Sequence, residues 1–204
     1  MRSNVSVAAL TKIFAEEITI QQATIYLDKI AGALWEEKRI SAFFEDAGQQ
    51  LREAWVGVKF GELIGCTHIQ LAPKAQEGFD VFLRHERGVL KYDVTEAMDR
   101  NRDRPSEFAE IKGAGSESDN EMSFQESEFF RVVGNRLKRK QDPQKRVVIY
   151  VNTGWLPEDP EIEPALQRWH ESFRSRYRSI HLLLRSGLIE LGPNFREIGN
   201  WRRG

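Results

Sequence analysis

The chain has 204 residues, of which 40% are hydrophobic and 30% are charged, a composition typical of globular proteins. Its 30 Lys and Arg nearly balance its 31 Asp and Glu, so any nucleic-acid-binding surface would have to be local. No apolar run reaches the roughly 20 residues that cross a bilayer, and the single cysteine, Cys66, excludes an internal disulfide. Because the N-terminus carries no evident secretory signal, we expect a cytoplasmic protein without a membrane partner.

The first part of the chain is predicted to be helical. Good helix formers run from Val5 to about Lys38, and Ile18-Thr19-Ile20 divides them into two short helices, the second from Gln21 to Glu37. A longer helix is predicted from Ser41, its N-cap, to Leu63. Its apolar face is formed by Phe43, Phe44, Ala47, Leu51, Trp55 and Val58. We expect residues 1–38 to form a helical extension and residues 39–204 to form the main domain.

A β-hairpin is predicted next. Its strands are residues 79–83 and 89–95, and the connection between them ends in Gly88, which a hairpin turn favours. Residues 99–123 are polar and lack periodicity, which is typical of a long loop. A helix is predicted to follow over residues 123–140.

Strands and helices alternate in the second half. The run Val147–Val151 predicts a strand over 146–151 that is buried on both faces. A helix is predicted over 161–177 and a strand over 179–184, while residues 188–191 either extend that strand or pair with it, and the C-terminal tail lies on the surface. We therefore predict an α/β fold, with a mixed, partly parallel sheet between helices on both faces and the hairpin at one edge. The strands 147–151 and 181–184 should be central and buried.

Two aspartates of the hairpin are candidates for chemistry. Asp80 opens the first strand, and alternation places Lys91, Asp93 and Thr95 on one face of the second strand. Paired hairpin strands can bring Asp80 and Asp93 together, and two close carboxylates repel unless a cation lies between them. Mg²⁺ or Mn²⁺ would suit such a site. The same acids are equally consistent with solvated residues on an exposed sheet face.

The order of elements, with an acid opening the hairpin, resembles the PD-(D/E)XK nuclease superfamily. Gly78-Phe79-Asp80 resembles its first motif element, and Asp93-Val94-Thr95 resembles the acid-x-lysine triplet of its second. The resemblance covers roughly residues 41 to 191 and implies a restriction-endonuclease-like three-layer core. It further implies that Asp80, Asp93 and the carbonyl of Val94 bind a metal that activates water for phosphodiester cleavage in DNA or RNA.

Thr95 departs from this pattern, because it stands where the superfamily has its catalytic lysine. Lys91 lies on the same strand face, and Lys138 and Lys140 lie on the predicted helix that follows, so any of the three could replace it. If none does, the site is inactive.

Further residues complete the predicted site. Glu62 falls within about 20° of the apolar stripe of its helix, so we expect it to point inward as a further acid. Arg100 and Arg102 could contact phosphates, although a charged loop explains them equally well. Lys138 and Lys140 are further candidates, for which a solvated basic face is the favoured alternative.

The leading hypothesis is a divergent metal-dependent nuclease acting on DNA or RNA. The alternative is a catalytically inactive protein that keeps the nuclease fold as a binding module. A small-molecule phosphohydrolase is a third class, for which the sequence has no specific feature.

Overall fold

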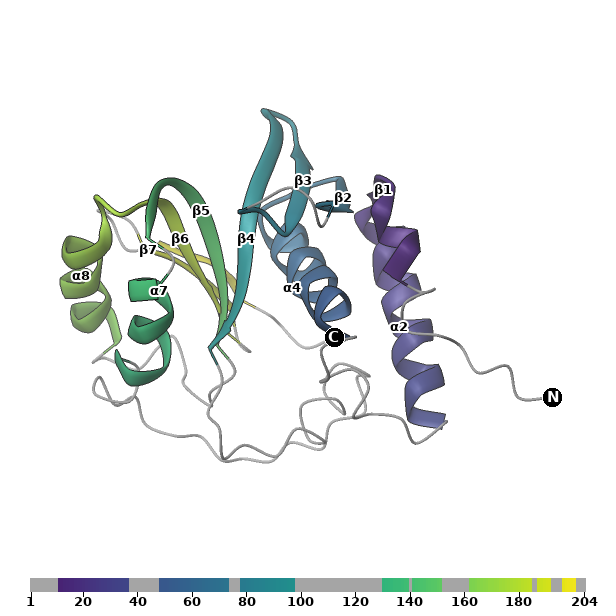
Figure 1. Cartoon of the computed structure of the whole chain (residues 1–204), viewed down its shortest axis with the longest axis horizontal. Helices are drawn as coiled ribbons and strands as arrows, with labels where there is room; N and C mark the ends of the chain where they lie inside the picture. Colours follow the sequence, from purple (N-terminus) through teal and green to yellow (C-terminus); the bar gives the residue numbers. More distant parts are fainter. Residues whose placement is uncertain are drawn as a thin grey trace. The chain divides into compact units, whose positions relative to one another are not determined.

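The computed structural model describes residues 11–36, 48–73, 78–97, 130–139, 141–151, 162–184, 187–191 and 196–200 (Figure 1). The chain divides into unit 1, which comprises Met1–Lys91 and Arg102–Ser118, and unit 2, which comprises Tyr92–Asn101 and Asp119–Gly204. The order of hydrogen-bonded strands follows the chain from β1 to β8. No helix in the described ranges is long and apolar enough to cross a membrane.

In its described residues, unit 1 combines the helices α2 and α4 with short antiparallel strands. Strand β2 pairs with β1 on one side and with β3 on the other. Helix α4 packs on α2 and on strands β2 and β3. The elements of unit 1 are η1 (Lys12–Ala15), β1 (Ile18–Thr19), α2 (Ile20–Glu36), α4 (Gln49–Leu63), β2 (His68–Leu71) and β3 (Val81–His85).

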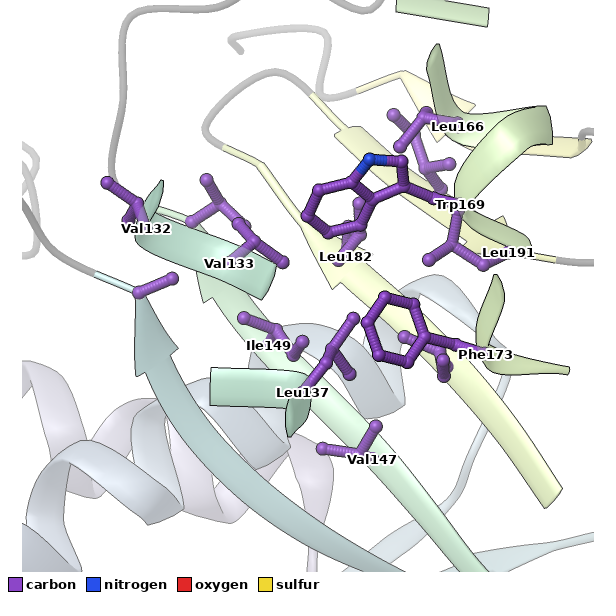
Figure 2. Close-up of a cluster of buried hydrophobic side chains, with 14 of the residues drawn as sticks. Val132, Val133, Leu137, Val147, Ile149, Leu166, Trp169, Phe173, Leu182 and Leu191 are labelled. Carbon is purple, nitrogen blue, oxygen red and sulfur yellow. The ribbon is translucent and has the colours of Figure 1, made fainter. Parts of the chain in front are cut away.

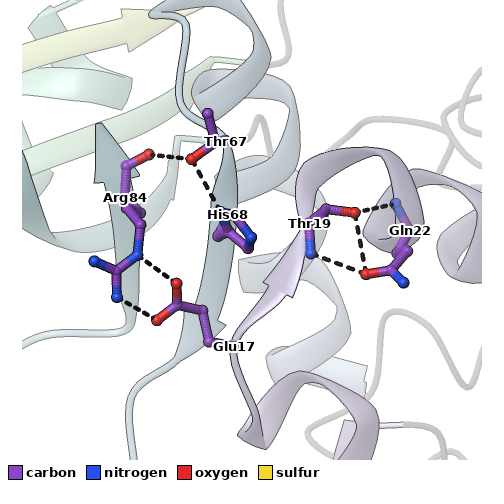
Figure 3. A network of polar contacts seen from close by, with 6 residues as sticks. All are labelled: Glu17, Thr19, Gln22, Thr67, His68 and Arg84. Atoms are coloured by element: carbon purple, nitrogen blue, oxygen red, sulfur yellow. Dashed lines mark hydrogen bonds and ion pairs between the residues drawn. The ribbon is translucent and has the colours of Figure 1, made fainter. Parts of the chain in front are cut away.

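Two sets of polar contacts fix the start of α2 in unit 1 (Figure 3). The Gln22 backbone N–H donates to Thr19 Oγ1, and the Thr19 backbone N–H donates to Gln22 Oε1, each over 3.1 Å. This is a reciprocal capping box, which satisfies two donors at the helix N-terminus. The Arg84 guanidinium donates to both oxygens of Glu17, over 2.5 and 2.6 Å, and this contact lowers the pKa of Glu17. The segment before α2 is thereby held against β3.

Unit 2 contains the parallel part of the sheet. Strand β4 (Gly88–Ala97) starts in unit 1 and continues into unit 2, where it pairs in parallel with β5. Strand β5 also pairs in parallel with β6, after which β6, β7 and β8 are antiparallel. The other elements are η3 (Phe130–Gly134, a π-helix), α7 (Asn135–Arg139), β5 (Asp142–Val151), α8 (Ile162–Phe173), β6 (Tyr177–Leu183), β7 (Gly187–Leu191) and β8 (Arg196–Asn200).

The core of unit 2 lies between the sheet and three helical segments, as Figure 2 shows. From the helices come Val133 of η3, Leu137 of α7 and Trp169 of α8, and from the strands come side chains such as Ile149 and Leu182. These aliphatic and aromatic residues are fully or almost fully buried, which is the main source of stability for such a layer.

Close packing at Gly134 joins η3 to α8. A Cβ atom at this glycine would lie 2.7 Å from Trp169 Cη2, which is closer than side-chain atoms approach one another. A larger residue at position 134 would therefore force the indole or the backbone of η3 to shift.

The predicted α/β class with a mixed, partly parallel sheet flanked by helices is confirmed. Strands β5 and β6 are central as predicted, and Val148, Ile149 and Leu182 are at most 1% exposed. The hairpin turn at Glu86–Arg87 is also confirmed, with Gly88 at φ +117°. The predicted strand at residues 188–191 exists as β7, which pairs with β6.

Several expectations about element positions are wrong. The hairpin is not at the sheet edge, because β2 and β1 continue the sheet beyond β3. The sequence patterns gave no sign of β1, β2 or β8. The helix predicted to reach residue 177 ends at Phe173, and β6 begins at Tyr177. Ser41 and residues 99–123 lie outside the described residues.

Candidate functional site

Asp93 is a buried acid on the helix-covered face of unit 2. It is the register partner of Val147 in the parallel ladder between β4 and β5, so the two side chains share a face of the sheet. Val147 belongs to the core beneath the helices, and Asp93 is only 4% exposed. The interpretation of Asp93 as a solvated surface acid is therefore wrong.

Lys145 provides the opposite charge for Asp93. Its Nζ lies 3.7 Å from Asp93 Oδ2, and the two side chains are 21% and 6% exposed. A buried carboxylate is costly unless it is paired, so this ion pair makes the burial of Asp93 tolerable. Lys145 precedes Val147 by two residues on β5, just inside a stretch where the pairing register with β6 shifts. Sequence reasoning missed this residue.

Tyr177 lies in the same region of unit 2. Its hydroxyl donates a hydrogen bond to the backbone carbonyl of Leu137, which ties the start of β6 to helix α7. Burial, together with the negative charge of Asp93, raises the pKa of Tyr177 to about 12. The phenol is therefore protonated at neutral pH and acts as a hydrogen-bond donor.

The other acid of the predicted pair belongs to unit 1. Asp80 is half-buried in the bend before β3, and its backbone carbonyl accepts a hydrogen bond of 2.8 Å from the Ala72 N–H. Since Asp80 lies in unit 1 and Asp93 in unit 2, their approach and shared cation stay a prediction.

The candidate replacements for the motif lysine differ in their surroundings. Lys91 is exposed, and its Nζ lies 5.6 and 5.3 Å from the ring centroids of Phe79 and Phe82, which are favourable cation–π contacts. Lys138 is exposed on α7, whereas Lys140 lies outside the described residues. Arg100 and Arg102 also lie outside them.

Thr95 and Val94 continue β4 beyond Asp93. Thr95 is half-buried and is the register partner of Ile149, while Val94 is 6% exposed. The threonine shares the face of Asp93, as alternation predicts, but brings no charge to it.

Glu62 does not point into the core. Its side chain is 35% exposed, and its carboxylate accepts a 2.9 Å hydrogen bond from Thr24 Oγ1 and lies 3.8 Å from Lys59 Nζ. The predicted inward orientation is wrong because the buried stripe at this end of α4 runs through Phe60 and Gly61. A role for Glu62 as a further acid stays a prediction.

The described residues around Asp93 provide only part of the predicted magnesium site. No group of three His, Cys, Asp or Glu residues that could hold a metal occurs within the described residues. The Lys145 ammonium already neutralises Asp93, and 4% exposure leaves little room for the water shell that magnesium retains. As they stand, these residues do not fit a hydrated magnesium ion.

A second polar group occupies the opposite face of the sheet in unit 2. His181 is the register partner of Val148, and its ring meets that of Tyr92 edge-on at 5.7 Å between centroids. His181 Nε2 lies 3.8 Å from Glu190 Oε1. Burial, together with the positive charge of Arg146, lowers the pKa of His181 to about 4, so the imidazole is neutral at pH 7.

Cys66 is not suited to nucleophilic chemistry. It is 8% exposed in unit 1, and burial raises the pKa of its thiol to about 11. The reactive thiolate is therefore almost absent at neutral pH.

Comparison with known proteins gives no independent assignment. No protein-family model, no curated protein and no solved structure matches this chain. Membership of the PD-(D/E)XK superfamily thus stays a prediction, and the case for function depends on the residues around Asp93.

Proposed function

We propose that this protein is a divergent nuclease that acts on DNA or RNA through a site centred on Asp93. In this proposal Lys145 takes the place of the lysine that the resemblance puts at position 95. The observation that carries it is the 3.7 Å ion pair between Lys145 Nζ and Asp93 Oδ2. An acid and a lysine that the superfamily places two residues apart on one strand would here come from two neighbouring strands.

The chemistry of phosphodiester hydrolysis explains why a lysine matters at this position. Water attacks phosphorus, the bond to the leaving alcohol breaks, and negative charge grows on the phosphoryl oxygens. A fixed ammonium stabilises that charge, and loss of a comparable donor typically costs roughly 10²- to 10³-fold in rate. Thr95 cannot supply this charge, whereas Lys145 lies on the same face of the sheet and keeps 21% of its surface accessible.

The resemblance implies magnesium or manganese as cofactor, which the geometry around Asp93 does not favour. Metal binding would require Lys145 to release the Asp93 carboxylate or a further acid such as Asp80 to join it. We therefore derive no step through a metal and treat metal dependence as a separate prediction.

Calorimetry and cleavage assays together test the proposal. The parent protein and Asp93→Asn are titrated with Mg²⁺ and with Mn²⁺, and plasmid and single-stranded substrates are then incubated with each protein. We expect cleavage by the parent and its loss in Asp93→Asn, whether or not added metal stimulates the reaction. Cleavage that survives in Asp93→Asn would place the activity elsewhere or in a contaminant, and an inactive parent would refute the enzyme.

A second candidate function, a nuclease-fold protein that binds without cleaving, is favoured by the low exposure of Asp93. An acid that is 4% exposed and neutralised by a lysine is also what remains when a catalytic site becomes structural. This candidate predicts nucleic-acid binding by the parent and by Asp93→Asn alike, with no turnover in either.

A further inference from the structure

The two charges of the ion pair at Asp93 differ in how far they reach solvent. The Asp93 side chain is 6% exposed, whereas the Lys145 side chain is 21% exposed. The 3.7 Å from Lys145 Nζ to Asp93 Oδ2 is longer than the roughly 2.7–3.2 Å of a hydrogen bond, so Asp93 does not use up the ammonium protons. A ligand would therefore reach this site through Lys145.

Packed groups surround Asp93 on the helix-covered face of unit 2. Its register partner Val147 and the nearby Leu137 of α7 are almost fully buried, and both belong to the core drawn in Figure 2. Besides burial, the charge of Asp93 raises the pKa of Tyr177, so these two groups lie near one another. The Tyr177 hydroxyl is bonded to the Leu137 carbonyl, which ties α7 to the start of β6. The described residues thus leave Asp93 little room for a broad ligand.

The shape of a nucleic acid decides whether one of its phosphates can reach a mostly buried lysine. A DNA duplex is a stiff rod with a persistence length of about 50 nm, so it cannot easily turn a single phosphate inward. A single strand is flexible. Enzymes whose target atom is out of reach in a duplex act on single strands or extrude a nucleotide.

We propose that the site at Asp93 and Lys145 takes a single-stranded nucleic acid, one phosphate of which contacts Lys145, and excludes an intact duplex. The inference deepens the proposed function by naming its substrate class, and it rests on that proposed site. Lysine suits the contact because its ammonium is a compact charge on a flexible stem, whereas the guanidinium of arginine is a wide planar fork.

Binding of matched ligands tests this substrate class. A labelled single strand, the blunt duplex of the same sequence and thymidine monophosphate are titrated in EDTA, which prevents metal-dependent cleavage, at several salt concentrations. The parent is compared with Lys145→Met. The control is Lys59→Met, which removes a lysine that lies 3.8 Å from Glu62 in unit 1. Thermal unfolding shows whether each variant is folded.

Loss of the Lys145 contact should weaken single-strand binding roughly tenfold, because a hydrogen bond to a charged group contributes about that factor. The slope of log K against log salt for the single strand should fall by about 0.7. Duplex binding should not change, and Lys59→Met should match the parent. An equal loss on the duplex, an equal loss in Lys59→Met, or binding of thymidine monophosphate as tight as that of the strand would overturn the inference.

Cleavage by the parent alone keeps the inference testable if Lys145→Met does not fold. In Mg²⁺ and in Mn²⁺ the parent is given the single strand, the blunt duplex and a duplex with a single-stranded overhang. We expect cuts in the single strand and in the overhang, with the paired region intact. Cuts in paired and unpaired regions at equal rates would overturn the inference.

The outcome is separable from that of the proposed function. Equal cleavage of single strand and duplex, both slowed in Lys145→Met, would refute the substrate class and keep the nuclease site. Single-strand binding that depends on Lys145, without any cleavage, would refute the enzyme and keep the single strand as the ligand of this site.

Discussion

Replacing Lys145 by methionine keeps most of the volume of the side chain and removes its charge, leaving Asp93 buried without its lysine. At 3.7 Å the attraction between two unit charges is about 4 kcal/mol at an effective dielectric of about 20. Lys145 is 21% exposed, so solvent screens part of this energy, and we expect a coupling of about 2 kcal/mol. Lys145→Met should therefore lower the free energy of unfolding by about that amount.

A double-mutant cycle isolates the pair from its surroundings. Urea unfolding is measured for the parent, Lys145→Met, Asp93→Asn and the double variant, and the destabilisation in the double variant should be clearly less than the sum of the two single ones. The matched control is Lys59→Met with Glu62→Gln, a pair at 3.8 Å whose side chains are 24% and 35% exposed. That cycle should give under about 1 kcal/mol. Equal coupling in the two cycles would refute a buried, energetically important pair at Asp93.

Other predictions concern the core, pH and the site. His181 has a folded pKa of about 4 against about 6.5 when unfolded, so the unfolded state takes up a proton first as the pH falls. The free energy of unfolding should therefore decrease by roughly 3 kcal/mol between pH 6.5 and pH 4, and His181→Phe should flatten this loss in pH-dependent urea unfolding. Gly134→Ala should lower the free energy of unfolding by about 1–3 kcal/mol, because its Cβ would lie 2.7 Å from Trp169. The control Gly32→Ala, which has open space around it, should instead stabilise helix α2. An unchanged melting temperature for Gly134→Ala would contradict the close packing at this glycine. Thr95→Lys should give little gain in cleavage if Lys145 already acts, so a large gain would show that the parent site lacks a working lysine.

Patterns carried by several residues predicted the fold well. The β-branched run from Val147 to Val151 is the centre of β5, and the glycine at position 88 ends the hairpin turn. Strand β1 has two residues and β2 has four, which is too short for alternation to be visible. The sequence therefore predicted a break between two helices at Ile18-Thr19, where the structure has strand β1.

The site was harder to predict because it depends on pairing between distant segments. Asp93 was recognisable from its place in the hairpin, but its burial follows from the parallel pairing with Val147, more than 50 residues later in the chain. Lys145 follows Pro143, which argues against a strand, so the predicted strand began only at Arg146. The register that brings Lys145 to Asp93 leaves no local signal in a single sequence.

The most direct test of the central claim is the single-turnover cleavage rate of an end-labelled oligonucleotide with protein in saturating excess, in Mg²⁺ and in Mn²⁺. We compare the parent, Lys145→Met and Lys59→Met. Cleavage by the parent that slows by roughly 10²- to 10³-fold in Lys145→Met and stays unchanged in Lys59→Met is the predicted result. Equal rates for the parent and Lys145→Met, or no cleavage by the parent, would contradict a nuclease site at Asp93 and Lys145.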